Sequence, residues 1–201
     1  MDGTLVNCTK LQTHILQQLF DTFNVDTFAL DLTKLIGPPL SLTFAKYFGQ
    51  ENVDAAFAKY KELYVNTQVH SITLMPGIQE LLANLKFMGY RIFVSSLQIQ
   101  SVVQKELEHL DILQYFDAVY GDNIDKPYSS KAEVIKSLIT NINLDPAQCV
   151  MIGDTDNDLL GGMHNGITAI GVMWGYGKHA FNDIQYTAND TNEVLSILQQ
   201  L

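Results

Sequence analysis

The segment that decides the fold is residues 149–158, Cys-Val-Met-Ile-Gly-Asp-Thr-Asp-Asn-Asp. Its first four residues form an apolar run typical of a buried strand, and a helix is expected directly afterwards, at 157–165. The polar loop between them therefore lies at the carboxyl end of a strand, where open α/β sheets bind ligands. Oxygen-rich loops of this kind suit Mg²⁺, although acids at a helix start can also simply complement the helix dipole.

The chain after Pro76-Gly77 alternates short apolar strands with helices. Such alternation predicts an α/β fold with a parallel sheet that is covered by helices on both faces. The expected strands are 91–95, 116–120, 149–152 and 167–172, and the expected helices include 131–140, 157–165 and 191–200.

Residues 9–73 show a helical pattern instead of alternating strands and helices, because their apolar residues recur at helical spacing in two stripes. Gly37-Pro38-Pro39 must form a turn between those helices, since consecutive prolines cannot lie inside a helix. We therefore predict an all-helical insertion at 9–73 and a core domain made of 1–8 and 74–201.

Composition limits the partners of the chain. Its 201 residues include 22 acidic and 12 basic side chains, for a net charge of −10. No basic run offers contacts to phosphates in series, so neither nucleic acid nor an anionic membrane is expected as a main partner. A small phosphorylated metabolite remains compatible, because a metal ion and one or two cations can reverse the local charge. Without a signal peptide or an 18-residue apolar stretch, we expect a soluble, cytoplasmic protein.

The chain starts Met1-Asp2-Gly3-Thr4-Leu5, far in sequence from the loop at 153–158. An Asp-Gly-Thr turn followed much later by Gly-Asp-x-x-x-Asp resembles the haloacid dehalogenase-like (HAD) phosphatases. The segment 171–177, Gly-Val-Met-Trp-Gly-Tyr-Gly, is similar to phosphoglycolate phosphatase-like members. The resemblance covers the whole chain. It implies a Rossmann-like core, a small helical cap inserted after the first motif, and Mg²⁺-dependent hydrolysis of a small phosphomonoester through an aspartyl-phosphate.

The resemblance also assigns roles to acidic residues. It implies that Asp154 binds Mg²⁺ directly and that Asp158 supports the ion directly or through water. Asp2 matches the second Asp of the family motif, which acts as general acid and then general base and whose backbone carbonyl also binds the metal. Asp156, between the two motif acids, is interpreted as a charge that complements the helix start.

The family motif reads Asp-x-Asp-Gly-Thr, and its first Asp is the nucleophile. Met1 occupies the x position, so the nucleophile would precede the sequence given. We expect the functional protein to start upstream, with an apolar central strand that ends in this Asp, and the chain as written to be nearly inactive. A chain without this strand would lose about four or five buried apolar side chains. At roughly 1.5–3 kcal/mol each, the lost free energy is on the order of the whole free energy of unfolding of a domain.

Ser95 and Ser96 end the strand expected at 91–95. The resemblance places a phosphate-binding hydroxyl here. Ser95 is the better candidate because it is the first hydroxyl after the apolar run, and Ser96 would contribute its backbone N–H. The alternative is that a serine after a strand simply starts a loop or caps a helix.

Two lysines compete for the role of phosphate-binding cation. Ser130-Lys131-Ala132-Glu133 predicts a capping box, and Lys131 then lies in the first helical turn. The helix dipole disfavours a cation there, so local stability does not explain this lysine, whereas a phosphate would. Lys126, which precedes Pro127, is the rival. We favour Lys131, where the resemblance also expects a catalytic lysine.

In the cap, Gly37 and Pro38 fall where related enzymes have a loop that closes over the substrate. The alternative is that they only turn the chain. Three functions fit the pattern: a phosphatase, a sugar-phosphate mutase or other hydrolase of the same fold, and a catalytically inactive domain that binds a phosphorylated ligand or a partner. Cap residues select the substrate, and no single motif encodes it.

Overall fold

The computed structural model describes residues 1–36, 40–66, 71–122, 128, 130–177 and 184–201. The chain divides into two compact units. Unit 1 contains Met1–Asn7 and Thr73–Leu201, and unit 2 contains Cys8–Ile72. These borders differ by one residue from those expected from the sequence. Within the described residues, no helix is both long and apolar enough to cross a membrane.

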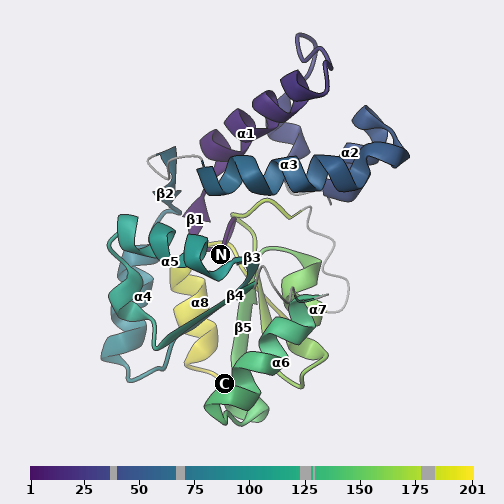
Figure 1. The fold of residues 1–201 in the computed structure, drawn as a ribbon. Helices are drawn as coiled ribbons and strands as arrows, with labels where there is room; N and C mark the ends of the chain where they lie inside the picture. The colour runs from purple at the N-terminus through teal and green to yellow at the C-terminus, as the bar shows by residue number, and fades with distance from the viewer. Residues whose placement is uncertain (37–39, 67–70, 123–127, 129, 178–183) are drawn as a thin grey trace. The chain divides into compact units, whose positions relative to one another are not determined.

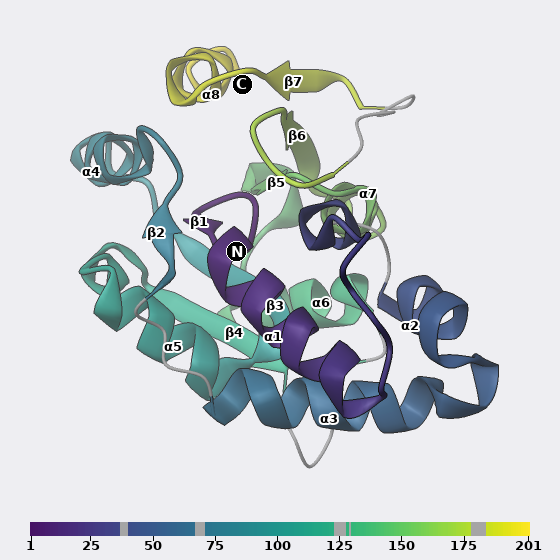
Figure 2. The same cartoon turned by 90° about the horizontal axis from the view of Figure 1, so that it is seen from above.

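Unit 1 is built on parallel strands with helices on both sides, which confirms the predicted fold class. Figure 2 shows α6 and α7 on one side of the strands and α4 and α8 on the other. The strands are β3 (Phe93–Ile99), β4 (Ala118–Asp122), β5 (Val150–Gly153), β6 (Thr168–Val172) and β7 (Tyr186–Ala188). The helices are α4 (Ile78–Phe87), α5 (Gln100–His109), α6 (Lys131–Ile142), α7 (Asp156–Met163) and α8 (Thr191–Leu198), with short 3-10 turns at Leu113–Tyr115 and Pro146–Gln148.

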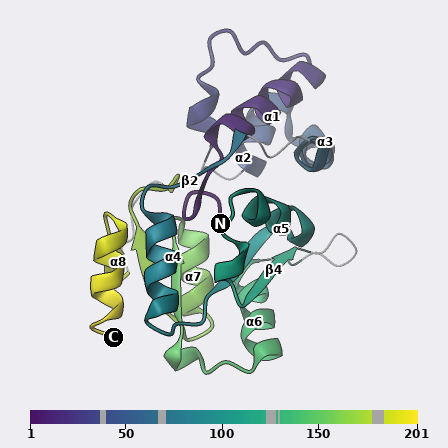
Figure 3. The same ribbon diagram turned by 90° about the vertical axis from the view of Figure 1, so that its left-hand side faces the viewer.

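The strands of unit 1 form two ladders instead of one continuous parallel sheet. β3 pairs with β4, and β5 pairs with β6, which also pairs with β7; no ladder among the described residues joins β3 to β5. Helices α6 and α7 connect the two ladders, because α6 packs on both β3 and α7 while α7 packs on β5 (Figure 3). Side-chain packing and polar contacts therefore take the place of backbone pairing between β3 and β5.

Four short or extended strands differ from the sequence-based expectation. β3 continues past Ser95 to Ile99, with a register shift against β4 after Ser95. The three-residue β7 was not predicted, and neither were β1 (Val6–Asn7) and β2 (Thr73–Leu74). Segments of two or three residues are too short to show a period of two, which is the pattern on which a strand prediction depends.

β1 and β2 form an antiparallel ribbon at the border of unit 1, which we call the border ribbon. Val6 pairs with Leu74, and Asn7 pairs with Thr73. Both passages of the chain between the two units run through this ribbon. It follows a tight turn in which Gly3, at a φ of 78°, donates its N–H to the Val6 carbonyl over 2.9 Å. A positive φ of this kind favours glycine.

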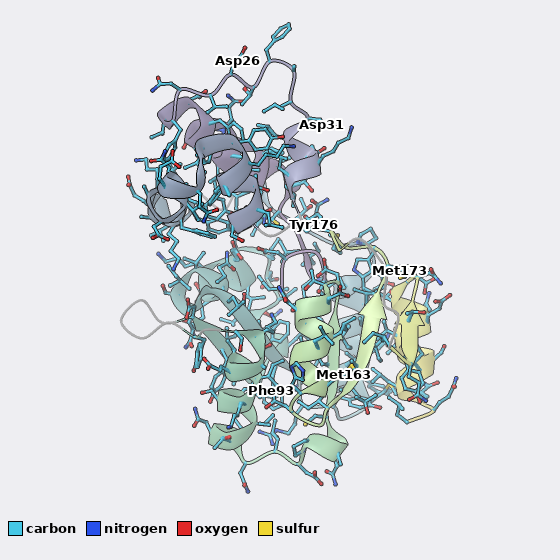
Figure 4. All side chains as sticks on the ribbon, turned by 90° about the vertical axis from the view of Figure 1, so that its right-hand side faces the viewer. Asp26, Asp31, Phe93, Met163, Met173 and Tyr176 are labelled. Atoms are coloured by element: carbon cyan, nitrogen blue, oxygen red, sulfur yellow. The ribbon has the colours of Figure 1, made fainter. Side chains whose placement is uncertain are left out.

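Unit 2 is entirely helical in its described residues, as predicted. The apolar stripe of the first helix is buried, and Phe44 packs edge-on against Phe57 with 4.9 Å between ring centroids. Asp26 and Asp31 lie on the connection after α1 (Figure 4). Gly37 and Pro38 lie outside the described residues. The elements are α1 (Thr9–Thr22), α2 (Leu40–Phe48) and α3 (Val53–Asn66), with 3-10 turns at Leu32–Leu35 and Gln50–Asn52.

A polar contact at the start of β4 makes the stability of unit 1 depend on pH. Asp117 Oδ2 accepts the Ile92 N–H over 2.7 Å and the Lys86 ammonium over 3.0 Å. The Ile92 hydrogen bond lowers the pKa of Asp117 and Lys86 adds to this effect, against an opposing contribution from burial. Because the folded pKa lies below the unfolded value of 3.8, this stabilisation is present above that pH and is lost as pH falls through the folded value.

We therefore expect Asp117→Asn to lower the free energy of unfolding at pH 7 by about 0.5–1.5 kcal/mol. The difference from the unaltered chain should shrink as pH falls below about 4. Urea unfolding between pH 2.5 and pH 7 measures both. Glu108→Gln, an exposed change on α5, is the control and should show neither effect. A constant difference for Asp117→Asn over the whole pH range would contradict the assignment.

Candidate functional site

Asp154 is the centre of the candidate site. It follows β5 directly, and only 1% of its surface is exposed. Thr4 Oγ1 donates to its Oδ1, and the Tyr176 N–H donates to its Oδ2, each over 2.8 Å. Tertiary structure therefore brings the N-terminal turn, the loop after β5 and the segment after β6 together on one carboxylate.

Three glycines make room for this carboxylate. A Cβ atom at Gly3 or Gly175 would overlap the Asp154 side chain, and one at Gly177 would overlap its backbone carbonyl. Gly3 also has the positive φ of its turn. The backbone can approach Asp154 this closely only where no side chain intervenes.

Lys131 is the buried cation of the site. It is the first residue of α6, follows the N-cap Ser130, and its side chain is only 9% exposed. Its Nζ lies 2.8 Å from Asp158 Oδ1 and donates to the Ser95 carbonyl over 2.8 Å. A buried ammonium is tolerated only when it is paired and hydrogen-bonded, and both conditions are met here. These contacts also connect the β3 ladder with the β5 side of unit 1.

Asp158 is held from two sides. Its Oδ2 accepts from Thr155 Oγ1 over 2.7 Å, in a full capping box at the start of α7. Burial acts to raise the pKa of Asp158, but the Lys131 ammonium and the hydrogen bonds from Lys131 and Thr155 act in the opposite direction, and the pKa is lowered. Asp158 is therefore a carboxylate that fixes Lys131.

The two serines at this end of β3 differ in their contacts. Ser96 Oγ accepts the Gln98 N–H over 3.1 Å. Ser95 Oγ is buried and has no hydrogen-bond partner among the described residues, while the Ser95 carbonyl binds Lys131. A buried hydroxyl without a partner costs free energy, which a hydrogen bond to a bound ligand would recover.

Asp2 lies half-buried in the N-terminal turn, next to Gly3, which in turn lies against Asp154. Lys126, the rival of Lys131, falls outside the described residues. Within the part of the chain that is described, no three His, Cys, Asp or Glu side chains are grouped closely enough to hold a metal ion by themselves.

The donor set nevertheless fits Mg²⁺. This ion is commonly held by one or two carboxylates, with water and substrate oxygens completing its octahedron. Each oxygen of Asp154 accepts one hydrogen bond from a described residue, although a carboxylate oxygen has two acceptor positions. Asp154 is therefore a suitable oxygen donor. The Asp158 oxygens contact Lys131 and Thr155.

The segment 173–177, which in the sequence is only part of a likeness to one subgroup of the family, supplies part of the site. The Trp174 indole N–H donates to the Thr4 carbonyl over 3.0 Å, and Tyr176 binds Asp154 through its backbone. The available signal was the pair of glycines at 175 and 177, separated by one residue. Sequence spacing could not reveal which group these glycines approach.

Comparison with known proteins is consistent with this geometry. A family model described as haloacid dehalogenase-like hydrolase matches residues 1–172. A 5'-nucleotidase of Pseudomonas aeruginosa is 31% identical over 183 residues, with 89% of this chain and 82% of that protein covered. A phosphoglycolate phosphatase of Aquifex aeolicus is 24% identical over 200 residues, with 98% and 93% covered.

One longer protein and one solved structure are also similar to this chain. The tyrosine-protein kinase PtkA of Mycobacterium tuberculosis is 28% identical over 91% of this chain, which spans 63% of the length of PtkA. The crystal structure of a predicted phosphatase from Clostridium acetobutylicum superposes with a TM-score of 0.89 at 27% identity, covering 100% of this chain and 96% of that one.

The buried ion pair generates a stability prediction. Lys131→Met leaves the Asp158 carboxylate buried without its cation, so it should lower the free energy of unfolding by about 3–5 kcal/mol. Lys59→Met is the matched control, because Lys59 pairs with Glu62 over the same 2.8 Å but at the surface, and should cost less than about 1 kcal/mol. Urea unfolding of both variants measures the difference, and equal effects would contradict it.

Proposed function

The chain belongs to the haloacid dehalogenase-like hydrolase family, and we propose that it is a Mg²⁺-dependent phosphatase when its active site is complete. In this proposal it hydrolyses a small phosphomonoester through an aspartyl-phosphate. The observation that carries the proposal is the meeting of three groups from separate elements. A buried ammonium (Lys131) contacts the carbonyl of a serine whose hydroxyl has no partner among the described residues (Ser95) and a carboxylate (Asp158) in the first turn of α7, just after Asp154.

Lys131 and Ser95 bind the phosphoryl oxygens in this proposal. The Lys131 ammonium has three N–H donors and uses two of them, toward the Ser95 carbonyl and Asp158. Its third donor and the Ser95 hydroxyl are available for two oxygens of a phosphate. Asp158 keeps the ammonium oriented, which fixes a cation where negative charge develops during transfer.

Asp154 and Asp2 would hold the metal ion, which when bound neutralises phosphate charge and orients the phosphoryl group. In the mechanism implied by the family, the carboxylate oxygen of an Asp two positions before Asp2 forms a bond to phosphorus while the bond to the leaving oxygen breaks. Asp2 gives a proton to that oxygen and then takes one from the water that attacks the aspartyl-phosphate. The nucleophile position precedes the sequence given.

The names of the relatives indicate a broad class of substrate and no single compound. Their names include a nucleotidase, a phosphoglycolate phosphatase and a kinase, so one fold carries several activities. We propose a small phosphorylated metabolite, which agrees with the acidic balance of the chain and with the buried Lys131 at the site.

The test is Mg²⁺-dependent hydrolysis of p-nitrophenyl phosphate by the 201-residue chain and by a chain extended to place an Asp two positions before Asp2. Activity should appear in the extended chain, and Asp154→Asn should reduce it by on the order of 100-fold, since a catalytic metal contributes several kcal/mol. Asp156→Asn, which changes an exposed acid at the start of α7, is the control and should stay within about twofold. Two folded but inert chains, on a broad panel of phosphate esters, would overturn the proposal.

Ser95 and Ser96 provide a second test. In the extended chain, Ser95→Ala should weaken competitive inhibition by inorganic phosphate by about tenfold or more, because it removes a hydrogen bond to a charged ligand. It should leave the free energy of unfolding nearly unchanged, since this hydroxyl has no partner among the described residues. Ser96→Ala should do the reverse, costing about 1 kcal/mol of stability with unchanged inhibition. Equal inhibition constants for Ser95→Ala and the unaltered chain would contradict the assignment.

A further inference from the structure

Tyr176 contacts two different parts of unit 1 through two different groups. Its backbone N–H donates to Asp154 Oδ2 over 2.8 Å, and its side-chain hydroxyl donates to Asn7 Oδ1 over 3.2 Å. Figure 4 shows Met173 and Tyr176 on the segment that follows β6. The backbone contact fixes the central carboxylate of the site, and the side-chain contact reaches away from it.

Asn7 is the last residue of unit 1 before the chain enters unit 2. It pairs with Thr73, the first residue after the chain returns, so it belongs to the border ribbon through which both passages run. The Tyr176 hydroxyl therefore binds the ribbon at the point where the chain leaves and re-enters the core.

A second path of hydrogen bonds closes a ring around Asp154. The Trp174 indole N–H binds the Thr4 carbonyl over 3.0 Å, and Thr4 Oγ1 binds Asp154 Oδ1 over 2.8 Å. A Cβ atom at Gly175, between Trp174 and Tyr176, would overlap the Asp154 side chain. The segment 173–177 is thus in direct contact with Asp154 and bound on both sides to the first seven residues of the chain.

We propose that Tyr176 is a positioning residue that couples the border ribbon to the Asp154 carboxylate. When Asn7 moves, the Tyr176 side chain moves with it through the hydroxyl hydrogen bond. The Tyr176 backbone N–H then shifts relative to Asp154 Oδ2. The affinity of Asp154 for a cation consequently depends on the position of the ribbon. The consequence for catalysis rests on the proposed function, in which Asp154 holds Mg²⁺; the coupling between Tyr176 and Asp154 does not.

The first experiment is a double-mutant cycle measured by urea unfolding without added metal. Tyr176→Phe removes the hydroxyl and leaves the backbone in place, and it is combined with Asp154→Asn. Coupled groups should give a double variant whose unfolding equilibrium constant departs from the product of the single effects by at least about twofold. Tyr90→Phe with Asp154→Asn is the matched control, since the Tyr90 hydroxyl also makes a 3.2 Å hydrogen bond, to the Leu198 carbonyl. Additive effects for Tyr176→Phe would overturn the proposal.

The second experiment uses Trp174, the single tryptophan of the sequence, as a fluorescent reporter. Titration with MgCl₂ should change its emission saturably, because Trp174 lies two residues from Tyr176 in the segment that contacts Asp154. Tyr176→Phe and Asn7→Ala should each weaken the apparent affinity for Mg²⁺ by about 2- to 10-fold, the effect of one hydrogen bond. Tyr90→Phe should titrate like the unaltered chain.

Failure of the proposed metal site and failure of the proposed role of Tyr176 give different results. If the unaltered chain gives no saturable response to Mg²⁺, the proposed metal site is wrong, and the unfolding cycle alone decides whether Tyr176 and Asp154 are coupled. If the unaltered chain responds and Tyr176→Phe titrates identically, the metal site stands and the positioning role of Tyr176 is refuted. Because Tyr176→Phe and Asn7→Ala keep Asp154, this readout does not depend on the folding of Asp154→Asn.

Discussion

The core of this protein depends on how it buries one ammonium group. Lys131 lies at the start of α6, where the helix dipole and burial both disfavour a cation. Asp158 and the Ser95 carbonyl compensate its charge, each at 2.8 Å. These two partners come from β3 and from α7, which packs on β5, and no strand ladder among the described residues joins β3 to β5. The Lys131 side chain is therefore a structural link between the two ladders of unit 1.

A second constraint concerns space around Asp154. The carboxylate is nearly inaccessible, yet three segments reach it, because glycines at positions 3, 175 and 177 let the backbone approach. Backbone and hydroxyl donors hold it in one orientation without neutralising it. An anionic group fixed in this way suits a hard cation, and the same contacts tie the carboxylate to the border ribbon.

Much of the architecture could be predicted from periodicity. Long segments such as 131–140 and 191–200 show enough repeats to identify a helix, and 149–152 is apolar enough to identify a buried strand. The two-residue strands of the border ribbon could not be found this way, and neither could the extension of β3 beyond Ser95. Strands of that length are defined by their partner, Leu74 for Val6, which is distant in sequence.

In the candidate site, too, some features could be predicted from local sequence patterns and others depend on tertiary contacts. The sequence by itself determined which residues carry charge at the ends of strands and helices: Asp154, Asp158 and Lys131 were identifiable because local patterns place them there. Only the tertiary structure decided their partners. It pairs Lys131 with Asp158, leaves the Ser95 hydroxyl unsatisfied while Ser96 binds Gln98, and gives the segment around Tyr176 a place at the carboxylate. The physical reason is that periodicity and capping act over a few residues, whereas hydrogen bonds and charge compensation in a buried site join groups far apart in the chain.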